Sequence, residues 1–209
     1  MIARGKRAQQ PITIGLVVSA SILAISTLLA STQNLSILEQ NIFTTIFEST
    51  NQLYNLALVI TLLGSGWMVL GLLISLLILK KNDIALQVLI LSSATYVVTQ
   101  FMKDTIARPR PLELLSSLAS RQYSAAGFGF PSGHSALSMV CALAILPYVS
   151  RPWKLGIILT VILVGLSRIY LGVHAPLDVI GGWSLAIVIW SLFMLVFSKN
   201  SLAKKSRKP

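Results

Sequence analysis

Charged residues are scarce in this sequence, and acidic residues are the scarcest. Only 11% of the 209 residues are charged, and Asp and Glu together contribute six. Soluble domains typically carry about 25% charged residues. The low share, together with 55% hydrophobic residues, therefore excludes an ordinary soluble domain. We expect residues 1–209 to form a single domain embedded in a membrane.

Cysteine and histidine are also rare. The single cysteine, Cys141, lies inside an apolar run, so the chain cannot form an internal disulfide, and we expect this side chain to serve in packing. The two histidines are His134 and His174. Both lie beside other polar groups at the rims of apolar segments, where charged groups are costly unless they are paired or functional.

Long hydrophobic runs, in contrast, fill most of the chain. We expect an all-α integral membrane bundle of six transmembrane helices, with the spans Ile12–Ala30, Leu53–Leu79, Ile84–Met102, Ser135–Val149, Leu155–Leu171 and Pro176–Phe197. The first run is too long for a signal peptide and lacks a small-residue cleavage pattern. The segment Leu35–Phe47 has apolar residues at helical spacing and predicts a short interfacial helix between the first two spans. Small residues at Gly64–Gly66 predict close helix contact.

The basic residues indicate which ends of the spans face the cytoplasm. Twelve of the seventeen Lys and Arg residues fall on one side if the N-terminus is cytoplasmic, and five of these lie in the tail Lys199–Pro209, which we expect to be disordered. This bias supports an N-in, C-in topology. Since the basic residues sit between apolar runs and form no stripe on a soluble face, we expect membrane lipids and no nucleic acid as partners. The sequence indicates no oligomeric state. The five basic residues left on the outer side are Lys103, Arg108, Arg110, Arg121 and Arg168.

The first of three polar clusters follows the third span. Lys103 and Arg110 are seven residues apart and bracket a turn that Pro109 and Pro111 stiffen. A guanidinium grips two phosphate oxygens as a fork, and an ammonium supplies a movable point charge. The alternative is that both cations contact anionic headgroups at the interface.

The second cluster, Pro131–His134, opens the fourth span. Gly133 lets the backbone approach a ligand closely, and the first amides of a helix form a seat for an anion. Ser132 offers a hydroxyl, and His134 has an ordinary pKa near 6.5 that suits transfer of a proton to a leaving oxygen. The alternative is a helix N-cap beside a histidine that reaches the interface.

The third cluster joins the fifth and sixth spans. It supplies another cation, Arg168, and it places Asp178 four residues after His174. A carboxylate in the first turn of the sixth helix can reach back to one ring nitrogen of His174, which leaves the other nitrogen free to attack phosphorus. A purely structural hydrogen bond between the two residues has the same spacing.

In order, the clusters read K-x6-R-P, P-S-G-H and S-R-x5-H-x3-D. This combination resembles the type 2 phosphatidic acid phosphatase family, whose lipid phosphatases share a site with vanadium haloperoxidases. The resemblance implies that His174 is the nucleophile, oriented by Asp178, and that His134 protonates the leaving oxygen. It also implies a phosphate-binding set made of Lys103, Arg110, Ser132, Gly133 and Arg168.

The resemblance further implies the activity. We expect a phosphatase acting on a lipid phosphate or diphosphate, most simply undecaprenyl diphosphate, at the outer face of a bacterial cytoplasmic membrane. Phosphatidylglycerophosphate and lipid A phosphate are alternative substrates, and a lipid-binding or transport protein without hydrolysis is an alternative of another class. We expect no metal or other cofactor, because a two-metal site needs clustered carboxylates or histidines. Arg108 is interpreted as a loop cation near a second phosphate or a headgroup, and Arg121 has no assigned role.

Overall fold

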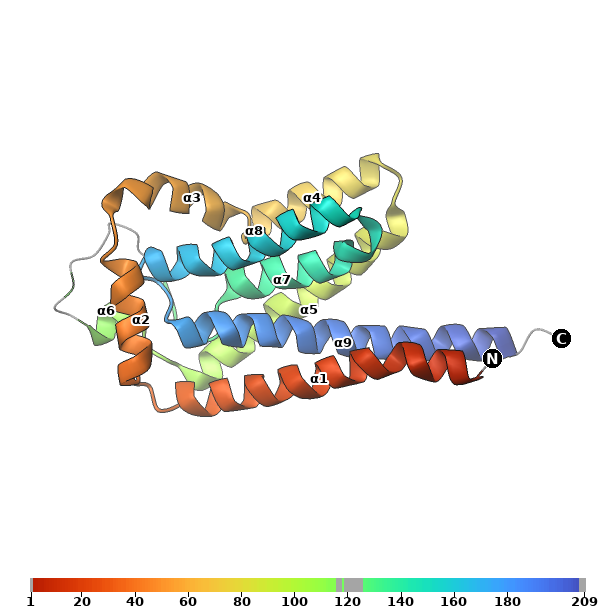
Figure 1. Cartoon of the computed structure of the whole chain (residues 1–209), viewed down its shortest axis with the longest axis horizontal. Coiled ribbons are helices and arrows are strands. Elements are labelled where there is room, and N and C mark those ends of the chain that lie inside the picture. The colour runs from red at the N-terminus through yellow and green to blue at the C-terminus, as the bar shows by residue number, and fades with distance from the viewer. Residues whose placement is uncertain (1, 116–117, 119–125, 207–209) are drawn as a thin grey trace.

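The protein is a bundle of helices (Figure 1). The computed structural model describes residues 2–115, 118 and 126–206, and the side chains from residue 10 to residue 197 within them. No strand occurs in these residues, so the predicted all-α class is confirmed. The helices are α1 (Ile2–Ala30), α2 (Ile37–Phe47), α3 (Tyr54–Leu62), α4 (Gly66–Ile78), α5 (Asn82–Ile106), α6 (Pro111–Leu114), α7 (Gly133–Ile145), α8 (Arg151–Tyr170) and α9 (Pro176–Ser206), with short 3-10 turns at Asn51–Leu53 and Leu146–Tyr148.

The number of helices that are long enough to cross a membrane is smaller than the six we predicted. In the described part of the chain, α1, α5, α8 and α9 are long and apolar enough, and α3 with α4 makes a fifth span if the bent pair counts as one. The helix at the predicted fourth span, α7, has 13 residues. At about 1.5 Å per residue it is roughly 20 Å long, shorter than a hydrocarbon core of about 30 Å. The six-span count is therefore not confirmed.

The predicted second span is broken near its middle. Helix α3 ends at Leu62, α4 begins at Gly66, and the two are bent by 48° relative to each other. The three residues between them continue as tight turns, in which the backbone N–H of Gly64 donates to the carbonyl of Thr61 at 3.0 Å. A methyl group on Gly64 would lie 2.6 Å from Cγ1 of Val164 and 2.7 Å from the carbonyl oxygen of His134. The close contact predicted here is confirmed at Gly64, where it occurs at a break in the helix, but a methyl group on Gly66 would meet nothing within 4 Å.

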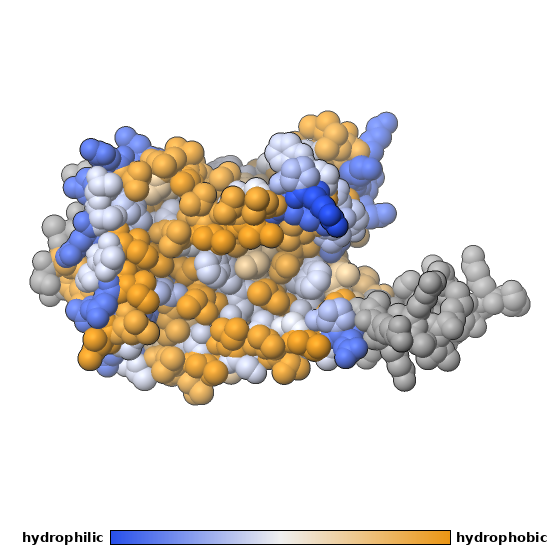
Figure 2. Space-filling view, viewed as in Figure 1, coloured by the Kyte–Doolittle hydropathy of each residue, from blue (hydrophilic) through white to orange (hydrophobic). Residues whose placement is uncertain are grey.

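Helix α7 lies inside the bundle, where α5, α8 and α9 surround it. Its small and apolar side chains Val140, Cys141 and Ala144 are buried in a core that α4, α5 and α9 complete. The packing role predicted for Cys141 agrees with this burial. On the outside, apolar side chains cover the middle of the molecule and hydrophilic ones gather toward its ends (Figure 2). This distribution fits a lipid environment around the middle.

Helix α2 runs across the ends of α8 and α9 (Figure 1), close to the orientation expected of an interfacial helix. Ser36 caps it by accepting a hydrogen bond from the backbone N–H of Glu39 at 3.2 Å. Its buried side chains are Glu39, Phe43 and Phe47, four residues apart, and the two phenyl rings stack with centroids 5.3 Å apart. Leu38, on the predicted apolar face, is 70% exposed instead. The face that packs inward therefore carries a carboxylate.

Candidate active site

The three polar clusters of the sequence meet at one cavity of about 390 Å³. It lies where the break between α3 and α4 faces the C-terminal end of α5, the start of α7 and the turn between α8 and α9. Six of the eight predicted site residues line it: Lys103, Arg110, Gly133, His134, Arg168 and His174. The other two, Ser132 and Asp178, are fully buried behind its wall.

His174 and Asp178 form the pair that the sequence predicted. His174 lies in the turn before α9, and its Nδ1 is 3.4 Å from Oδ2 of Asp178. The same oxygen accepts a hydrogen bond from the backbone N–H of Ala175 at 2.9 Å. Pro176 begins α9 and so places Asp178 in its first turn, because proline suits the first position of a helix. The contact at Nδ1 leaves Nε2 as the nitrogen available for chemistry.

The surroundings of His174 keep its imidazole neutral. Burial lowers the pKa of His174 well below its usual value of 6.5, and the positive charges of Arg168, Lys103 and Arg110 lower it further. A protonated ring in this position would be desolvated and surrounded by cations. The neutral form, which has a free lone pair to act as a nucleophile, therefore predominates at neutral pH.

Backbone carbonyl oxygens hold the two cations of the first cluster. Arg110 donates from Nη1 to the carbonyl of Val173 at 2.5 Å, from Nε to that of Gly127 at 2.8 Å, and from Nη2 to that of Ala126 at 2.9 Å. The ammonium of Lys103 donates to the carbonyls of Phe128 and Gly129. The segment 126–129 thus orients both cations beside the cavity.

Arg168 is oriented from a different direction. Only 2% of it is exposed, and its Nη1 donates to Oγ1 of Thr61 on α3 at 2.8 Å. Thr61 was not predicted from the sequence, because no neighbouring residue in the chain indicates that it binds Arg168. Thr61 can bind Arg168 because the bend after α3 brings the end of this helix to α8. Thr99, one turn before Lys103 on α5, also lines the cavity and was not predicted.

The Pro131–His134 turn starts α7 as predicted. Oγ of Ser132 accepts hydrogen bonds from the backbone N–H and the hydroxyl of Ser135, at 3.5 and 2.9 Å, which is N-cap geometry. Its backbone N–H donates to the carbonyl of Asp178 at 2.9 Å. The N-cap alternative thus describes the fold of this turn, and phosphate binding by Ser132 stays a prediction.

Tight packing of α9 brings the second and third clusters together. A methyl group on Gly182 would lie 2.5 Å from the carbonyl oxygen of Ser132 and 3.2 Å from the backbone nitrogen of Ala136. Since a side chain at this position would push α9 away from α7, glycine permits the approach that places His174 beside His134. Gly133, by contrast, has only Thr99 nearby, at 3.7 Å.

Arg108 is where the interpretation of the sequence was wrong. It is 1% exposed and contacts two carboxylates, Asp178 at 2.8 Å and Glu39 at 2.7 Å. It therefore lies behind the His174–Asp178 pair and does not face a headgroup. The sequence signal for its partner was weak, because Glu39 looks like an ordinary surface carboxylate of an amphipathic helix. The other unassigned cation, Arg121, lies outside the described residues.

Carboxylates, histidines and cysteine do not gather in threes anywhere in the part of the chain that the structure describes. The cavity instead presents Lys103, Arg110 and Arg168 together with two imidazoles. Such a set of groups favours an anion as the ligand, since guanidinium and ammonium groups bind phosphate oxygens directly.

A comparison with protein families shows which family this chain belongs to. The family model of the PAP2 superfamily matches residues 84–202, more than half of the chain. The chain belongs to the PAP2 superfamily. The family resemblance inferred from the sequence is thereby confirmed. The match includes all eight predicted site residues but begins after α2, α3 and α4.

Two curated proteins are each similar to 62% of this chain. An undecaprenyl-diphosphatase of Sulfolobus acidocaldarius is 32% identical over 133 residues, which are 62% of this chain and 63% of the relative. Phosphatidylglycerophosphatase B of Bacillus subtilis is 31% identical over 140 residues, 62% of this chain and 64% of the relative. The similarity thus spans just under two thirds of each relative.

Two solved structures share the PAP2 fold. Aquifex aeolicus LpxE superposes with a TM-score of 0.70 at 28% identity, covering 77% of this chain and 96% of the other. A transmembrane PAP2 type phosphatidylglycerolphosphate phosphatase from Bacillus subtilis superposes with a TM-score of 0.69 at 23% identity, covering 87% and 96%. Together with the apolar helices, these likenesses make the chain a multi-pass helical membrane protein of this superfamily.

Proposed function

We propose that the protein is a metal-independent membrane phosphatase that hydrolyses a lipid phosphate or diphosphate through a phosphohistidine. The observation that carries the proposal is the convergence of two imidazoles and three cations on one cavity. Three positive charges offset the charge of a phosphate and stabilise a transition state whose charge spreads over its equatorial oxygens.

The proposed reaction has two steps, formation of a phosphohistidine and its hydrolysis. Nε2 of His174 attacks phosphorus while the bond from phosphorus to the leaving oxygen breaks. Burial and the charges of Arg168, Lys103 and Arg110 lower the pKa of His134 to about 3, so His134 takes up the proton that it gives to this oxygen only when the negatively charged phosphate is bound. Asp178 holds Nδ1 of His174 and so directs Nε2 toward the phosphorus. A water molecule then attacks the phosphohistidine, His134 takes a proton from it, and inorganic phosphate leaves with His174 restored.

A lipid substrate fits the surroundings of the cavity. A second, more open pocket of about 430 Å³ adjoins it, and the two share Gly66, Tyr96 and Leu137 in their walls. The second pocket continues between α4 and α5 with apolar lining. This arrangement supports a phosphate headgroup entering the cationic cavity from the side, with its hydrocarbon chain on the apolar surface.

For the native substrate we propose undecaprenyl diphosphate, which would yield undecaprenyl phosphate. The similarity to an undecaprenyl-diphosphatase supports it. Phosphatidylglycerophosphate is the second candidate, and the similarity to phosphatidylglycerophosphatase B supports that reading. Lipid A phosphate is a third. We place the site at the outer face of a bacterial cytoplasmic membrane, on the distribution of basic residues.

The test measures phosphate release by the purified protein in detergent and EDTA with undecaprenyl diphosphate, phosphatidylglycerophosphate, phosphatidate and lipid A phosphate. We expect release in EDTA, and its loss in His174→Ala while that variant still binds the preferred lipid. Tyr148→Phe, at an exposed position in the turn after α7, is the control and should keep full turnover. No release from any lipid would favour the binding or transport alternative, and normal turnover by His174→Ala would exclude the phosphohistidine.

A further inference from the structure

A buried chain of charges begins on α2 and ends at the catalytic pair. The guanidinium of Arg108 lies between two carboxylates: Nη2 donates to Oε2 of Glu39 at 2.7 Å, and Nη1 donates to Oδ1 of Asp178 at 2.8 Å. Nη1 also donates to Oε1 of Glu39 at 3.1 Å. Arg108 and Asp178 are at most 1% exposed and Glu39 is 8% exposed. Glu39 thus grips Arg108 with both oxygens, and Arg108 binds one oxygen of Asp178.

The two oxygens of Asp178 have separate partners. Oδ1 binds Arg108, and Oδ2 faces Nδ1 of His174 and the backbone N–H of Ala175. The plane of a carboxylate is fixed when both of its oxygens are held from different sides. The position of Arg108 therefore determines where Oδ2 lies, and with it the direction of the imidazole.

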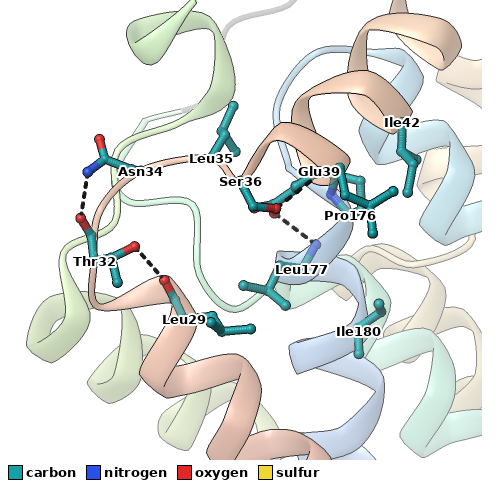
Figure 3. Close-up of a pocket in the computed structure, with 11 residues that line it drawn as sticks. Leu29, Thr32, Asn34, Leu35, Ser36, Glu39, Ile42, Pro176, Leu177 and Ile180 are labelled. Carbon is teal, nitrogen blue, oxygen red and sulfur yellow. Dashed lines mark hydrogen bonds between the residues drawn. The ribbon is translucent and has the colours of Figure 1, made fainter.

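Further hydrogen bonds keep Glu39 and Arg108 in place. Oε1 of Glu39 accepts from the backbone N–H of Leu177, in the first turn of α9, at 3.1 Å. Nη2 of Arg108 donates to the carbonyl of Asn34 at 2.9 Å. Figure 3 shows Glu39 reaching from α2 to the start of α9, beside Pro176 and Leu177 and next to Ser36. The link therefore joins α2 to the helix that carries Asp178.

If this charge network served only to hold α2 against α9, it would be an unfavourable choice in free energy. Buried ion pairs give little net stability, because removing charges from water costs about as much as their attraction returns. Apolar side chains would join α2 to α9 as well, and Phe43 and Phe47 already pack α2 against Ile169 and Val179. The network instead supplies a fixed countercharge to a fully buried catalytic carboxylate.

We propose that Glu39 and Arg108 are positioning residues for the phosphatase reaction, acting through Asp178 on His174. This inference rests on the proposed function. Glu39 lies on α2, outside residues 84–202 that match the family model. Its contact with Arg108 therefore comes from a part of the chain that the family model does not include. Without the charge on Glu39, Arg108 is attracted by Asp178 alone and draws its carboxylate away from the imidazole.

The test is a double-mutant cycle on turnover by the full-length protein. We expect Glu39→Gln, which keeps the size of the side chain, to lower kcat about 10- to 100-fold, the effect of a misplacement of about 1 Å. KM should change less than about twofold, because the phosphate-binding cations are untouched. Glu48→Gln is the matched control, since Glu48 is an exposed glutamate at the end of the same helix, and it should leave both constants unchanged.

The decisive arm combines Glu39→Gln with Asp178→Asn. If Glu39 acts through Asp178, it has no further effect once Asp178→Asn has removed the catalytic carboxylate, and the double variant should match Asp178→Asn in kcat. Effects that multiply would overturn the proposal, as would a normal kcat in Glu39→Gln. If Glu39→Gln does not fold, Arg108→Lys takes its place in the cycle, because an ammonium cannot grip one carboxylate with two nitrogens and bind a second.

The same experiment separates this inference from the proposed function. Wild-type turnover and an acid-labile, base-stable phosphoenzyme that His174→Ala lacks test the phosphohistidine itself. A wild-type enzyme that forms the phosphoenzyme, combined with multiplicative effects in the cycle, would retain the proposed function and reject the positioning role. A wild-type protein that never forms the phosphoenzyme would reject both.

Discussion

At the scale of single residues, different groups hold the cations of the cavity and its imidazole. In the proposed reaction the cations bind phosphate and the imidazole attacks it. Arg110, Lys103 and Arg168 are each oriented by oxygen atoms that belong to other segments, so their charges are in place before a ligand arrives. His174 is oriented by a carboxylate and lies among those charges. Such preorganisation lowers the reorganisation needed during the reaction.

The lowered pKa of His174 predicts the acid side of the pH profile. The reactive form is neutral, so activity falls as pH drops through the pKa of His174, and that pKa is depressed from 6.5. We expect the acid-side fall of kcat/KM, which reports the free enzyme, to lie below pH 6.5. Arg168→Ala removes one of the cations that depress the pKa of His174, so its residual activity should begin to fall at a higher pH. An unchanged midpoint in that variant would contradict the electrostatic account.

The residues that meet at the cavity could be predicted from the sequence because the proposed chemistry fixes their types and their local spacing. A histidine four residues before an aspartate, and a serine and glycine at the start of a helix, are visible within a single turn. Glu39 and Thr61 were missed because each acts on a residue more than 65 positions away. Arg108 was misinterpreted for the same reason: an arginine in a proline-rich loop looks exposed until both its partners are known.

At the scale of helices, the break between α3 and α4 brings the backbone against His134. Apolar composition alone predicted one continuous span, because leucine and valine suit a helix on both sides of the break. The sequence indicated the small residues correctly but not the bend, which depends on tertiary contacts with α7 and α8. Likewise, the hydropathy of α7 predicts a transmembrane helix, although α7 is short and other helices enclose it.

Gly64→Ala tests the closeness of this contact. The added methyl group would meet the backbone oxygen of His134 and a methyl of Val164, so we expect a loss of stability of about 1–3 kcal/mol, the usual cost of overpacking. Because His134 moves with its backbone, turnover should fall as well. Gly66→Ala is the control, since a methyl group there meets nothing within 4 Å. Thermal unfolding in detergent measures the difference, and equal melting temperatures for the two variants would contradict the packing described.

At the scale of the whole molecule, α1 and α9 run side by side, and the start of α1 lies at the same end as the end of α9 (Figure 1). Helix α2 and the turn that carries His174 lie toward the other end. This arrangement agrees with termini on one side of the membrane and a site nearer the opposite side. The positive-inside bias assigns the termini to the cytoplasm, which stays a prediction.

Labelling of cysteines in intact cells tests that orientation. Cys141 is buried, so it should give little background, and single cysteines at the exposed residues Asn51 and Arg151 report the two ends. We expect a membrane-impermeant maleimide to label Asn51→Cys in intact cells and Arg151→Cys only after permeabilisation. The reverse pattern would place the active site on the cytoplasmic side.

The interruption between α3 and α4, which includes Gly64 and Ser65, also bears on the hydration of the interior. Backbone without regular helical bonding persists at membrane depth only where protein encloses it or where it lines a hydrated space. Gly64 and Ser65 line the cationic cavity. Polar backbone groups in the wall of the cavity favour its hydration inside an otherwise apolar bundle. In the proposed reaction this is where water has to reach the phosphohistidine, so a continuous helix here would be expected to slow the second half-reaction.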